Sequence, residues 1–270
     1  MDNIAAKSVI HPNAKIGPNV YIGPFSFIDD NVEIGEGSWI GPNVTIFSGA
    51  RIGSNVKIFP GAVIAGIPQD LKFAGEDTTA EIGDGSIIRE YVTINRGTKA
   101  AAKTVVGKNC LLMAYVHIAH DCILGDNIVL ANNVNLAGHV EVQDWVIIEG
   151  QVGVQQFTRL GQHSFVAGGS LVRKDVPPYI RAAREPLAYI GINRIGLERR
   201  SFEHEVINNI QDIYRYIFVR GMNLSNALQH VEQIVPPSPE RDHIISFIQH
   251  SKNGIVRSFQ NVNGSKIYED

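Results

Sequence analysis

The stretch NVEIGEGSWIGPNVTIFSGARIGSNVKIFPGAVI, residues 31–64, repeats one hexapeptide pattern and decides the fold. An aliphatic residue stands at every sixth position, often followed by glycine, and a small or β-branched residue stands four positions after it. The same phase continues without a slip over residues 10–172. The aliphatic positions are Ile10, Ile16, Ile22, Ile28, Ile34, Ile40, Ile46, Ile52, Ile58, Ile64, Ile82, Ile88, Ile94, Val106, Leu112, Ile118, Leu124, Leu130, Leu136, Val142, Ile148, Val154, Leu160, Val166 and Val172. A repeat of this period indicates a parallel β-helix, whose interior is filled by the stacked aliphatic side chains.

The residues between the aliphatic positions suit tight corners. Gly, Asn and Asp recur there, and these residues tolerate the positive φ angles that such corners require. The pattern resembles the hexapeptide-repeat acyltransferases, which implies a left-handed prism with three hexapeptides, or about 18 residues, in each coil. We therefore expect an all-β left-handed parallel β-helix over residues 1–190.

Two segments interrupt the repeat. Residues 65–81 (AGIPQDLKFAGEDTTAE) are expected to replace about one coil, and residues 97–104 (GTKAAAKT) form a shorter excursion. Loops that leave a rigid scaffold are where binding function concentrates. Both excursions are therefore candidates for contact with a ligand.

The chain after the repeat predicts a C-terminal α-helical domain over residues 191–258. Ser201 is the expected N-cap of a first helix that ends before Gly221. A second helix is expected over 224–234, and a third from Ser238 to about Gly254, with Pro239 at its first turn. The polar tail, residues 259–270, is expected to be disordered.

The composition is that of an ordinary globular protein, with 44% hydrophobic and 19% charged residues and a net charge of -3. It argues against nucleic-acid binding, and no apolar run is long enough to insert stably into a membrane. The N-terminus lacks a signal-peptide pattern, so a cytoplasmic location is expected. Cys110 and Cys122 fall at small inward positions and predict buried thiols without a redox role. Residues 155–220 carry ten Lys and Arg against six Asp and Glu, which suggests an anionic partner there.

The stretch LLMAYVHIAHDC, residues 111–122, contains the candidate chemistry. Its His-x-x-His-Asp pattern has three interpretations. The histidines could be solvated or stacked corner residues, they could bind zinc, or His120 could be a general base whose ring is oriented by Asp121.

Coil arithmetic favours the general base. With about 18 residues in each coil, His120, Gly138 and Gln156 share one column, and Asp121 and His139 lie in the next, with coils about 4.8 Å apart. Gly138 allows a ligand to approach the backbone, and its N–H is free to stabilise an oxyanion. Zinc needs at least three well-placed ligands, and we expect one subunit to offer no such cluster. The sequence therefore predicts no metal and no cofactor.

Six blocks give a close resemblance to the UDP-N-acetylglucosamine acyltransferase family, which covers about residues 8–255. They are QDLKFAGE (69–76), IREYVTINRGT (88–98), LLMAYVHIAHDC (111–122), LANNVNLAGHVEV (130–142), VPPY (176–179) and GINRIGLERRSF (191–202). The related N-acyltransferases carry an extra N-terminal uridine-binding domain, whereas this sequence starts directly on the repeat. The O-acyltransferases are therefore the better match.

The resemblance implies transfer of an (R)-3-hydroxyacyl group from acyl carrier protein to the 3-hydroxyl of UDP-N-acetylglucosamine, the first step of lipid A biosynthesis. His120 would be the general base, Asp121 its support and the Gly138 N–H the oxyanion donor. It also implies a homotrimer in which a loop with Asp70 and Lys72 reaches a neighbour's site. The implied substrate-binding residues are Asp70, Lys72, His117, His139, Gln156, Asn193, Arg199 and Arg200.

Three positions bear on substrate specificity. Many family members have His where this chain has Asn95 and Gln155, so details of sugar or acyl recognition differ while the reaction class stays. The family's acyl-chain ruler corresponds to Gly168, which leaves the channel open for longer chains, although Phe165 nearby could shorten it. The resemblance thus implies an acyl chain of roughly a dozen carbons or more, by analogy with those members.

Three alternatives stay open on the sequence. One is a zinc enzyme like the β-helical carbonic anhydrases, and another is a scaffold or lectin-like repeat protein without catalysis. The third is an acyltransferase whose sugar acceptor carries a 3-amino group, since residue spacing does not separate O- from N-acylation.

Overall fold

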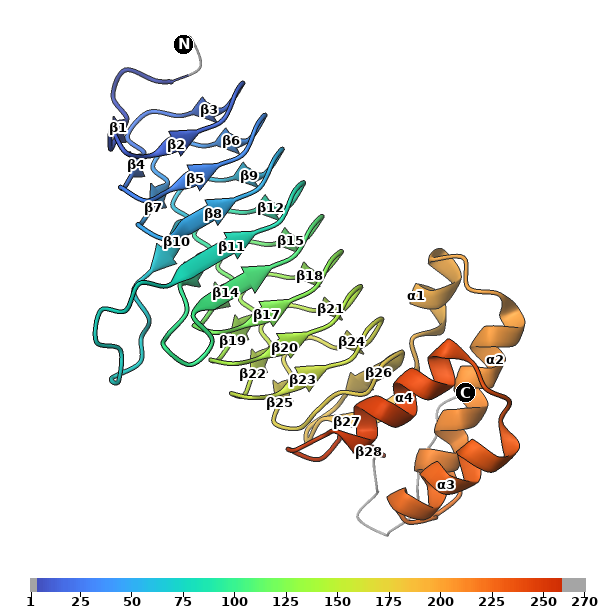
Figure 1. The fold of residues 1–270 in the computed structure, drawn as a ribbon. Coiled ribbons are helices and arrows are strands. Elements are labelled where there is room, and N and C mark those ends of the chain that lie inside the picture. The colour runs from blue at the N-terminus through green and yellow to red at the C-terminus, as the bar shows by residue number, and fades with distance from the viewer. Residues whose placement is uncertain (1–3, 259–270) are drawn as a thin grey trace.

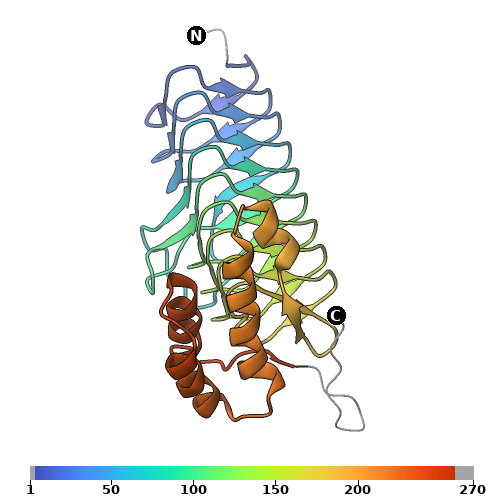
Figure 2. The same ribbon diagram turned by 90° about the vertical axis from the view of Figure 1, so that its right-hand side faces the viewer.

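The computed structural model describes residues 4–258, so the predicted tail over 259–270 lies outside the described residues. The chain winds into a three-sided prism of stacked coils, as Figure 1 shows, and along the repeat the strands of each sheet pair in parallel. Helices pack at the C-terminal end of this prism and lie along its side (Figure 2). Each sheet forms one face of the prism, and the chain turns a corner between faces.

The three sheets take one strand each from every coil. The nine-stranded sheet contains β1 (Val9–Ile10), β4 (Phe27–Ile28), β7 (Thr45–Ile46), β10 (Val63–Gly66), β13 (Thr93–Asn95), β16 (His117–Ile118), β19 (Asn135–Leu136), β22 (Gly153–Val154) and β25 (Leu171–Val172). The eight-stranded sheet contains β2 (Lys15–Ile16), β5 (Glu33–Ile34), β8 (Ala50–Ile52), β11 (Thr79–Ile82), β14 (Lys103–Val106), β17 (Ile123–Leu124), β20 (Glu141–Val142) and β23 (Arg159–Leu160). The eleven-stranded sheet contains β3 (Tyr21–Ile22), β6 (Trp39–Ile40), β9 (Lys57–Ile58), β12 (Ile87–Ile88), β15 (Leu111–Leu112), β18 (Val129–Leu130), β21 (Ile147–Ile148), β24 (Phe165–Val166), β26 (Ile180–Ala183), β27 (Ala188–Ile192) and β28 (Arg257–Ser258).

The register confirms the predicted columns. His117 pairs with Asn135, and Asn135 with Gly153, so equivalent residues are 18 positions apart. The second residue of most strands points inward, as Ile118 and Leu136 do, and both are fully buried. Stacked aliphatic side chains form the core, as the hexapeptide pattern predicts.

Both cysteines are buried among these aliphatic side chains, as expected. Burial raises the pKa of the Cys110 thiol to about 11 and that of Cys122 to about 12. The thiolate is the reactive form, so both groups are inert at neutral pH.

At one corner of the prism, one residue in each of several successive coils adopts a left-handed backbone conformation, and the equivalent side chains form a column. Asp121 has φ 61°, His139 has φ 61° and Phe157 has φ 65°. These residues occupy the same corner in three successive coils, between the nine-stranded and eight-stranded sheets. We call this edge, residues 119–122 and their equivalents in later coils, the histidine corner.

The two excursions differ from the expectation in one respect. Ala80 pairs with Ala50, thirty positions earlier, so the segment between β10 and β11 adds twelve residues to a coil that is still completed. Thr104 pairs with Ala80, twenty-four positions earlier, so the second excursion adds six. The prediction that 65–81 replaces a coil is therefore wrong. Because both additions are multiples of six, the sequence phase hides them.

The C-terminal helices are α1 (Arg194–Arg199), α2 (His204–Tyr214), a π-helical turn η1 (Arg215–Val219), α3 (Leu224–Ile234) and α4 (Pro239–Gln249). The predicted second helix coincides with α3. Ser201 is not an N-cap, because the caps are Asn193 for α1 and Glu203 for α2. Ser201 instead ends α1 with φ 59°, while its N–H donates to Glu198 O and the Phe202 N–H donates to Leu197 O. This is a Schellman motif, which terminates a helix.

The third predicted helix is also shorter than expected, because α4 ends at Gln249. The chain beyond it returns to the prism, where the Asp175 N–H donates to Gly254 O and the Val256 N–H donates to Asp175 O. These backbone bonds compete with helix continuation and hold residues 254–256 against the last coil. Within residues 4–258, no helix is long and apolar enough to cross a membrane.

Candidate active site

A buried histidine–aspartate pair lies at the histidine corner. His120 Nδ1 is 2.8 Å from Asp121 Oδ2, and the two side chains are 10% and 0% exposed. The turn from β16 to β17 places both residues there: His120 belongs to the column of Gly138 and Gln156, and Asp121 to that of His139. The structure thus brings together the pair that the sequence predicts.

Asp121 is surrounded by further donors. The Thr98 N–H donates to Oδ1 at 2.8 Å, the Thr98 hydroxyl donates to Oδ2 at 2.6 Å, and the Ala101 N–H donates to Oδ1 at 3.3 Å. Burial raises the pKa of the Asp121 carboxyl, but hydrogen bonds from Thr98 and His120 outweigh burial, and the pKa lies below its usual 3.8. The carboxyl group is therefore ionised at neutral pH.

The ionised carboxylate fixes the tautomer of His120. A carboxylate accepts hydrogen bonds only, so the ring must carry its proton on Nδ1, which donates to Asp121. Nε2 then keeps its lone pair. A neutral imidazole with this orientation can accept a proton from a bound hydroxyl group.

Gly138 lies against the face of the His120 ring. A β-carbon at residue 138 would be 2.7 Å from Cε1 and 2.8 Å from Nε2 of His120, so no larger residue fits there without a shift. In the part of the chain that the structure describes, the Gly138 N–H donates to no acceptor. A free backbone donor beside the lone pair of the base is suited to hold a developing oxyanion.

Two aromatic contacts support the pair from the next coils. The His139 ring meets the His120 ring edge-on at 5.2 Å and stacks on the Phe157 ring at 4.7 Å. His139 Nε2 also lies 3.5 Å from Asp121 Oδ2. His139, which the sequence analysis assigns to substrate binding, therefore also packs against the His120–Asp121 pair.

The sequence argument against a metal cluster is wrong in its premise. His120, Asp121 and His139 of one chain offer three ligand atoms within 4.8 Å of one another. However, Asp121 Oδ2 already accepts hydrogen bonds from the Thr98 hydroxyl and from His120. A zinc ion bound to this oxygen would have to displace at least one of these donors, so the geometry favours proton transfer over zinc binding.

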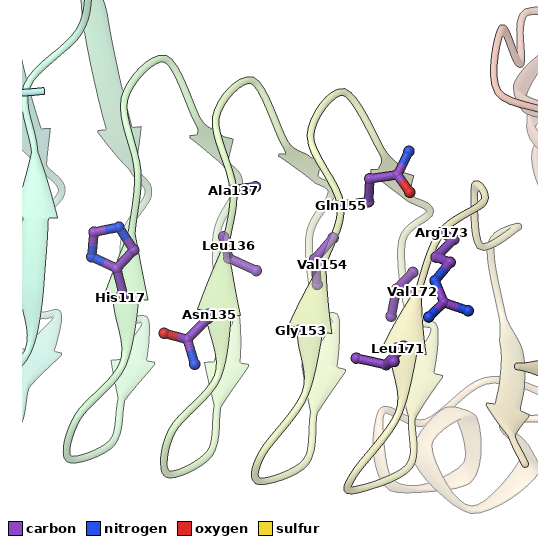
Figure 3. A pocket seen from close by; sticks show the side chains of 10 residues that line it. All are labelled: His117, Asn135, Leu136, Ala137, Gly153, Val154, Gln155, Leu171, Val172 and Arg173. Carbon is purple, nitrogen blue, oxygen red and sulfur yellow. The ribbon is translucent and has the colours of Figure 1, made fainter. Parts of the chain in front are cut away.

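An open groove lies on the nine-stranded sheet next to this corner, with a volume of about 430 Å³. Figure 3 shows His117, Asn135, Gly153 and Leu171 in one row across β16, β19, β22 and β25, with Gln155 at one side. The Thr93 hydroxyl lies 2.7 Å from His117 Nδ1, and burial lowers the pKa of His117, which favours the neutral ring. The groove has an apolar floor and polar walls, so it can hold an acyl chain.

The positions that depart from the family pattern lie in different surroundings. Gln155 is exposed and lines the groove, whereas Asn95 is buried and its Nδ2 donates to Ile67 O. Gly168 lies at the corner between the eleven-stranded and nine-stranded sheets, where its N–H donates to Glu149 Oε2. Gly168 is not among the residues that line the groove of a single chain.

Gln156 is exposed above Gly138 in the column of His120. Asp70 and Lys72 lie in the excursion between β10 and β11, where the Lys72 N–H donates to Asp70 Oδ1. The Arg96 guanidinium stacks 5.4 Å from the Phe73 ring and holds this loop to the second excursion. The loop projects from the prism, as Figure 1 shows, and in it Lys72 is exposed and Asp70 half-buried.

The predicted nucleotide contacts lie at another corner, between the eight-stranded and eleven-stranded sheets. Asn193 is buried, caps α1 by accepting from the Gly196 N–H, and donates to His163 O. Arg200 donates to Trp145 O at 3.2 Å, and its guanidinium lies 5.2 Å from the Trp145 ring. Arg199 is exposed. We call this edge, with Trp145, Asn193, Arg199 and Arg200, the arginine corner. One chain therefore does not bring Arg199 and Arg200 to His120.

Two residues of these sites were not predicted. Thr98 bonds both oxygens of Asp121, but it lies in the shorter excursion, whose six added residues break the 18-residue spacing. Trp145 occupies the left-handed position of the arginine corner with φ 62°, and an aromatic residue there was the only available signal.

Comparisons with known proteins agree on one group. Residues 175–256 match the family described as UDP-N-acetylglucosamine O-acyltransferase, domain 2, and residues 31–66 and 103–138 match the bacterial transferase hexapeptide repeats. The chain is 45% identical over 258 residues to an acyl-[acyl-carrier-protein]–UDP-N-acetylglucosamine O-acyltransferase of Alkalilimnicola ehrlichii, covering 95% of this chain and 100% of the relative. A relative of the same name from Thiobacillus denitrificans is 41% identical with the same coverage.

Solved structures extend the similarity to the whole fold. The UDP-N-acetylglucosamine acyltransferase of Bacteroides fragilis superimposes with a TM-score of 0.93 at 52% identity, covering 94% of this chain and 99% of that one. The enzyme of the same family from Acinetobacter baumannii gives 0.92 at 39% identity, covering 95% and 100%. The expected fold class, a left-handed β-helix of hexapeptide repeats followed by helices, is confirmed.

Replacing Asp121 by Asn tests the ionised carboxylate. Because the folded-state pKa of Asp121 is depressed, its charge stabilises the fold at neutral pH, and this contribution is lost as the pH falls through the folded-state pKa, below 3.8. We expect the variant to be less stable than wild type by about 1–3 kcal/mol at pH 7, with the gap narrowing in acid. Urea unfolding at a series of pH values measures the stability difference at pH 7 and its change with pH. A gap that stays constant down to pH ~3 would contradict the assignment.

Proposed function

The chain belongs to the family of acyl-[acyl-carrier-protein]–UDP-N-acetylglucosamine O-acyltransferases, and from this premise we propose how His120 carries out the reaction. The protein is an acyltransferase. It moves an (R)-3-hydroxyacyl group from acyl carrier protein to the 3-hydroxyl of UDP-N-acetylglucosamine, the first step of lipid A biosynthesis. The observation that carries the mechanism is the buried His120–Asp121 pair beside the free N–H of Gly138.

In the proposed reaction, His120 Nε2 accepts the proton of the sugar 3-hydroxyl while the oxygen attacks the thioester carbonyl carbon. The carbonyl oxygen becomes an oxyanion and is held by the Gly138 N–H. The ionised Asp121 stabilises the imidazolium that forms. Collapse of the intermediate breaks the carbon–sulfur bond, and the imidazolium returns its proton to the departing thiolate.

The relatives also bear on the alternatives. Their names specify O-acylation, which supports a hydroxyl acceptor over a 3-amino sugar. A zinc enzyme would need Asp121 Oδ2 to give up at least one of its bonds with Thr98 and His120. A scaffold without catalysis is set aside, because the curated relatives are enzymes.

The three prism faces differ in charge, and this supports the proposed trimer. The outward residues of the eight-stranded sheet form ion pairs along the stack, such as Arg159 with Glu141 at 3.0 Å, as expected for a face in water. From β12 to β24 the outward row of the eleven-stranded sheet is aliphatic and aromatic instead, with Lys57 before it and Arg181 after it. The row consists of Ile87, Leu111, Val129, Ile147 and Phe165. An apolar row of this length calls for a partner.

Packing this apolar face against the grooved nine-stranded sheet of a neighbour leaves the charged face in solvent. Three subunits close such a ring and satisfy every subunit equally. The corner between the two packed faces, which carries the stacked Tyr91 and Tyr115, then lies near the three-fold axis. The other two corners meet at the rim, so the histidine corner of one subunit lies beside the arginine corner of the next.

This arrangement gives each predicted substrate residue a place. His120 would act on the sugar, while Arg199 and Arg200 of the neighbour would bind the diphosphate, for which the guanidinium fork is suited. Asn193 would position these arginines through α1. The loop with Asp70 and Lys72 starts at the histidine corner, from β10, and would cover the shared site. The acyl chain would lie between the groove and the neighbour's apolar face, with Gly168 at its inner end.

The acyl donor would approach along the column of His120. Lys174 belongs to that column, three coils beyond His120, which corresponds to about 14 Å at the usual strand spacing. Arg173 and Lys174 are exposed, and Lys252 lies on the segment that packs beside them. Acyl carrier protein is strongly acidic, so these cations form a docking surface within reach of its phosphopantetheine arm.

His120→Ala tests the general base. A positioned base contributes about 10²–10⁴ in rate, so we expect kcat to fall by that factor while the oligomer stays folded. Steady-state assays with a 3-hydroxyacyl thioester of acyl carrier protein and UDP-N-acetylglucosamine measure it, with circular dichroism as the folding control. Activity close to wild type would rule out the mechanism.

Mixed trimers test the shared site. His120→Ala and Arg200→Ala subunits should each give a nearly inactive enzyme, but every mixed trimer contains one site with both residues intact. Random one-to-one mixing should therefore restore about a quarter of wild-type activity, because about three quarters of the trimers are mixed and each has one working site of three. Mixed trimers separated from the homotrimers should show about a third. Co-expression of two differently tagged chains followed by tandem purification provides the sample. An absence of restored activity in purified mixed trimers would place both residues in one subunit's own site.

Reversing Arg173 and Lys174 together to Glu tests the docking surface. We expect a raised KM for the acyl carrier protein thioester and an almost unchanged KM for the nucleotide sugar, since only the protein substrate is acidic. The wild-type KM for the protein substrate should also rise with salt, because exposed charges are screened beyond about 8 Å at physiological ionic strength. Lys15→Glu, at the far end of the prism, is the control. A selective effect on the nucleotide sugar would refute the proposal.

A further inference from the structure

We propose that Thr98 is a positioning residue for catalysis, which acts through Asp121 and not by contact with substrate. Thr98 lies in the shorter excursion, which spans residues 96–102 between β13 and β14 in the structure, and is 7% exposed. Its backbone N–H and its hydroxyl hold the two oxygens of Asp121 and so set the plane of the carboxylate that orients His120. This inference rests on the proposed role of His120 as the base.

The direction of the Thr98 hydroxyl is fixed by its own partners. Thr98 Oγ1 accepts from the Ala100 N–H at 3.2 Å, so its single proton is left for Asp121 Oδ2 at 2.6 Å. Asp121 Oδ2 also accepts from His120 Nδ1 at 2.8 Å. Two donors on one oxygen leave the carboxylate little freedom to rotate about χ2, and the imidazole is held with it.

The backbone of Thr98 is fixed from both neighbouring strands. The Thr78 hydroxyl donates to Gly97 O at 2.6 Å, and the Gly97 N–H donates to Thr79 O. A β-carbon at Gly97 would lie 2.2 Å from Lys103 N, so the excursion passes against β14 where only glycine fits. These contacts hold the excursion in one position around Asp121.

Positioning of Asp121 by Thr98 should affect the chemical step more than substrate binding. Thr98 is not among the residues lining the groove, and both of its bonds to Asp121 are buried. Losing the hydroxyl would let the carboxylate turn, and the His120 lone pair would point less often at the sugar hydroxyl. The loss should appear in kcat, with KM for both substrates nearly unchanged.

Thr98→Val and Thr98→Ser separate the hydroxyl from the rest of the side chain. Valine keeps the shape and the backbone N–H but removes the donor, and we expect kcat to fall about ten-fold with both KM values within about two-fold of wild type. Serine restores the donor and should restore kcat to within about three-fold. Thr98→Ala, which removes the same hydroxyl, replaces the valine variant if that variant fails to assemble.

Thr78→Val is the matched control, because it removes another buried hydroxyl that braces the same excursion without touching Asp121. It should lower the melting temperature and reduce kcat by clearly less than Thr98→Val does, because the Gly97 N–H still holds the excursion to Thr79 O and both Thr98 donors to Asp121 remain. An equal loss of kcat in Thr78→Val and Thr98→Val, or a Thr98→Ser variant as slow as Thr98→Val, would overturn the proposal. Wild-type kcat in Thr98→Val would do the same while His120→Ala stays inactive. If His120→Ala is active, it is the proposed mechanism that fails.

Discussion

The stacking of one coil on the next is the constraint on which the rest of the structure depends. Backbone hydrogen bonds between parallel strands pair residues 18 positions apart, as with His117 and Asn135, and hold them at strand separation. Side chains distant in sequence therefore become neighbours in a column without any tertiary folding of loops. The site inherits its precision from this ladder: Gly138 lies against His120 because one coil separates them.

The same constraint explains what could be predicted from the sequence. Wherever coils are uninterrupted, counting places residues correctly, and His120, Asp121, Gly138 and His139 were brought together in this way. Counting fails across an excursion, and Thr98 was missed because the residues between it and Asp121 include such an addition. It also fails where rotamers decide, so the three potential metal ligands around Asp121 could not be foreseen. Ser201 was misplaced because its residue type suits an N-cap, while the backbone bonds that end α1 involve Glu198 and Leu197.

Hydrogen-bond donors supplied by the fold keep the Asp121 carboxyl group ionised although it is buried. A carboxyl group buried among apolar residues would ordinarily become neutral, and a neutral Asp121 could not hold the proton of His120 on Nδ1. Thr98 and Ala101, both from the shorter excursion, keep it charged. The excursion that interrupts the repeat thus supplies donors that the proposed role of His120 requires.

The return of residues 250–256 to the last coil has a consequence for how the solenoid ends. Any stack of parallel strands has a terminal row of unpaired N–H and C=O groups, which can recruit further strands and lead to fibres. Here Asp175 pairs with Ile255 across that terminal row, and β28 continues the eleven-stranded sheet beside β27. The C-terminal segment therefore serves as a molecular end-stop. Removing it would leave the backbone N–H and C=O groups of Asp175 unpaired at the end of the stack.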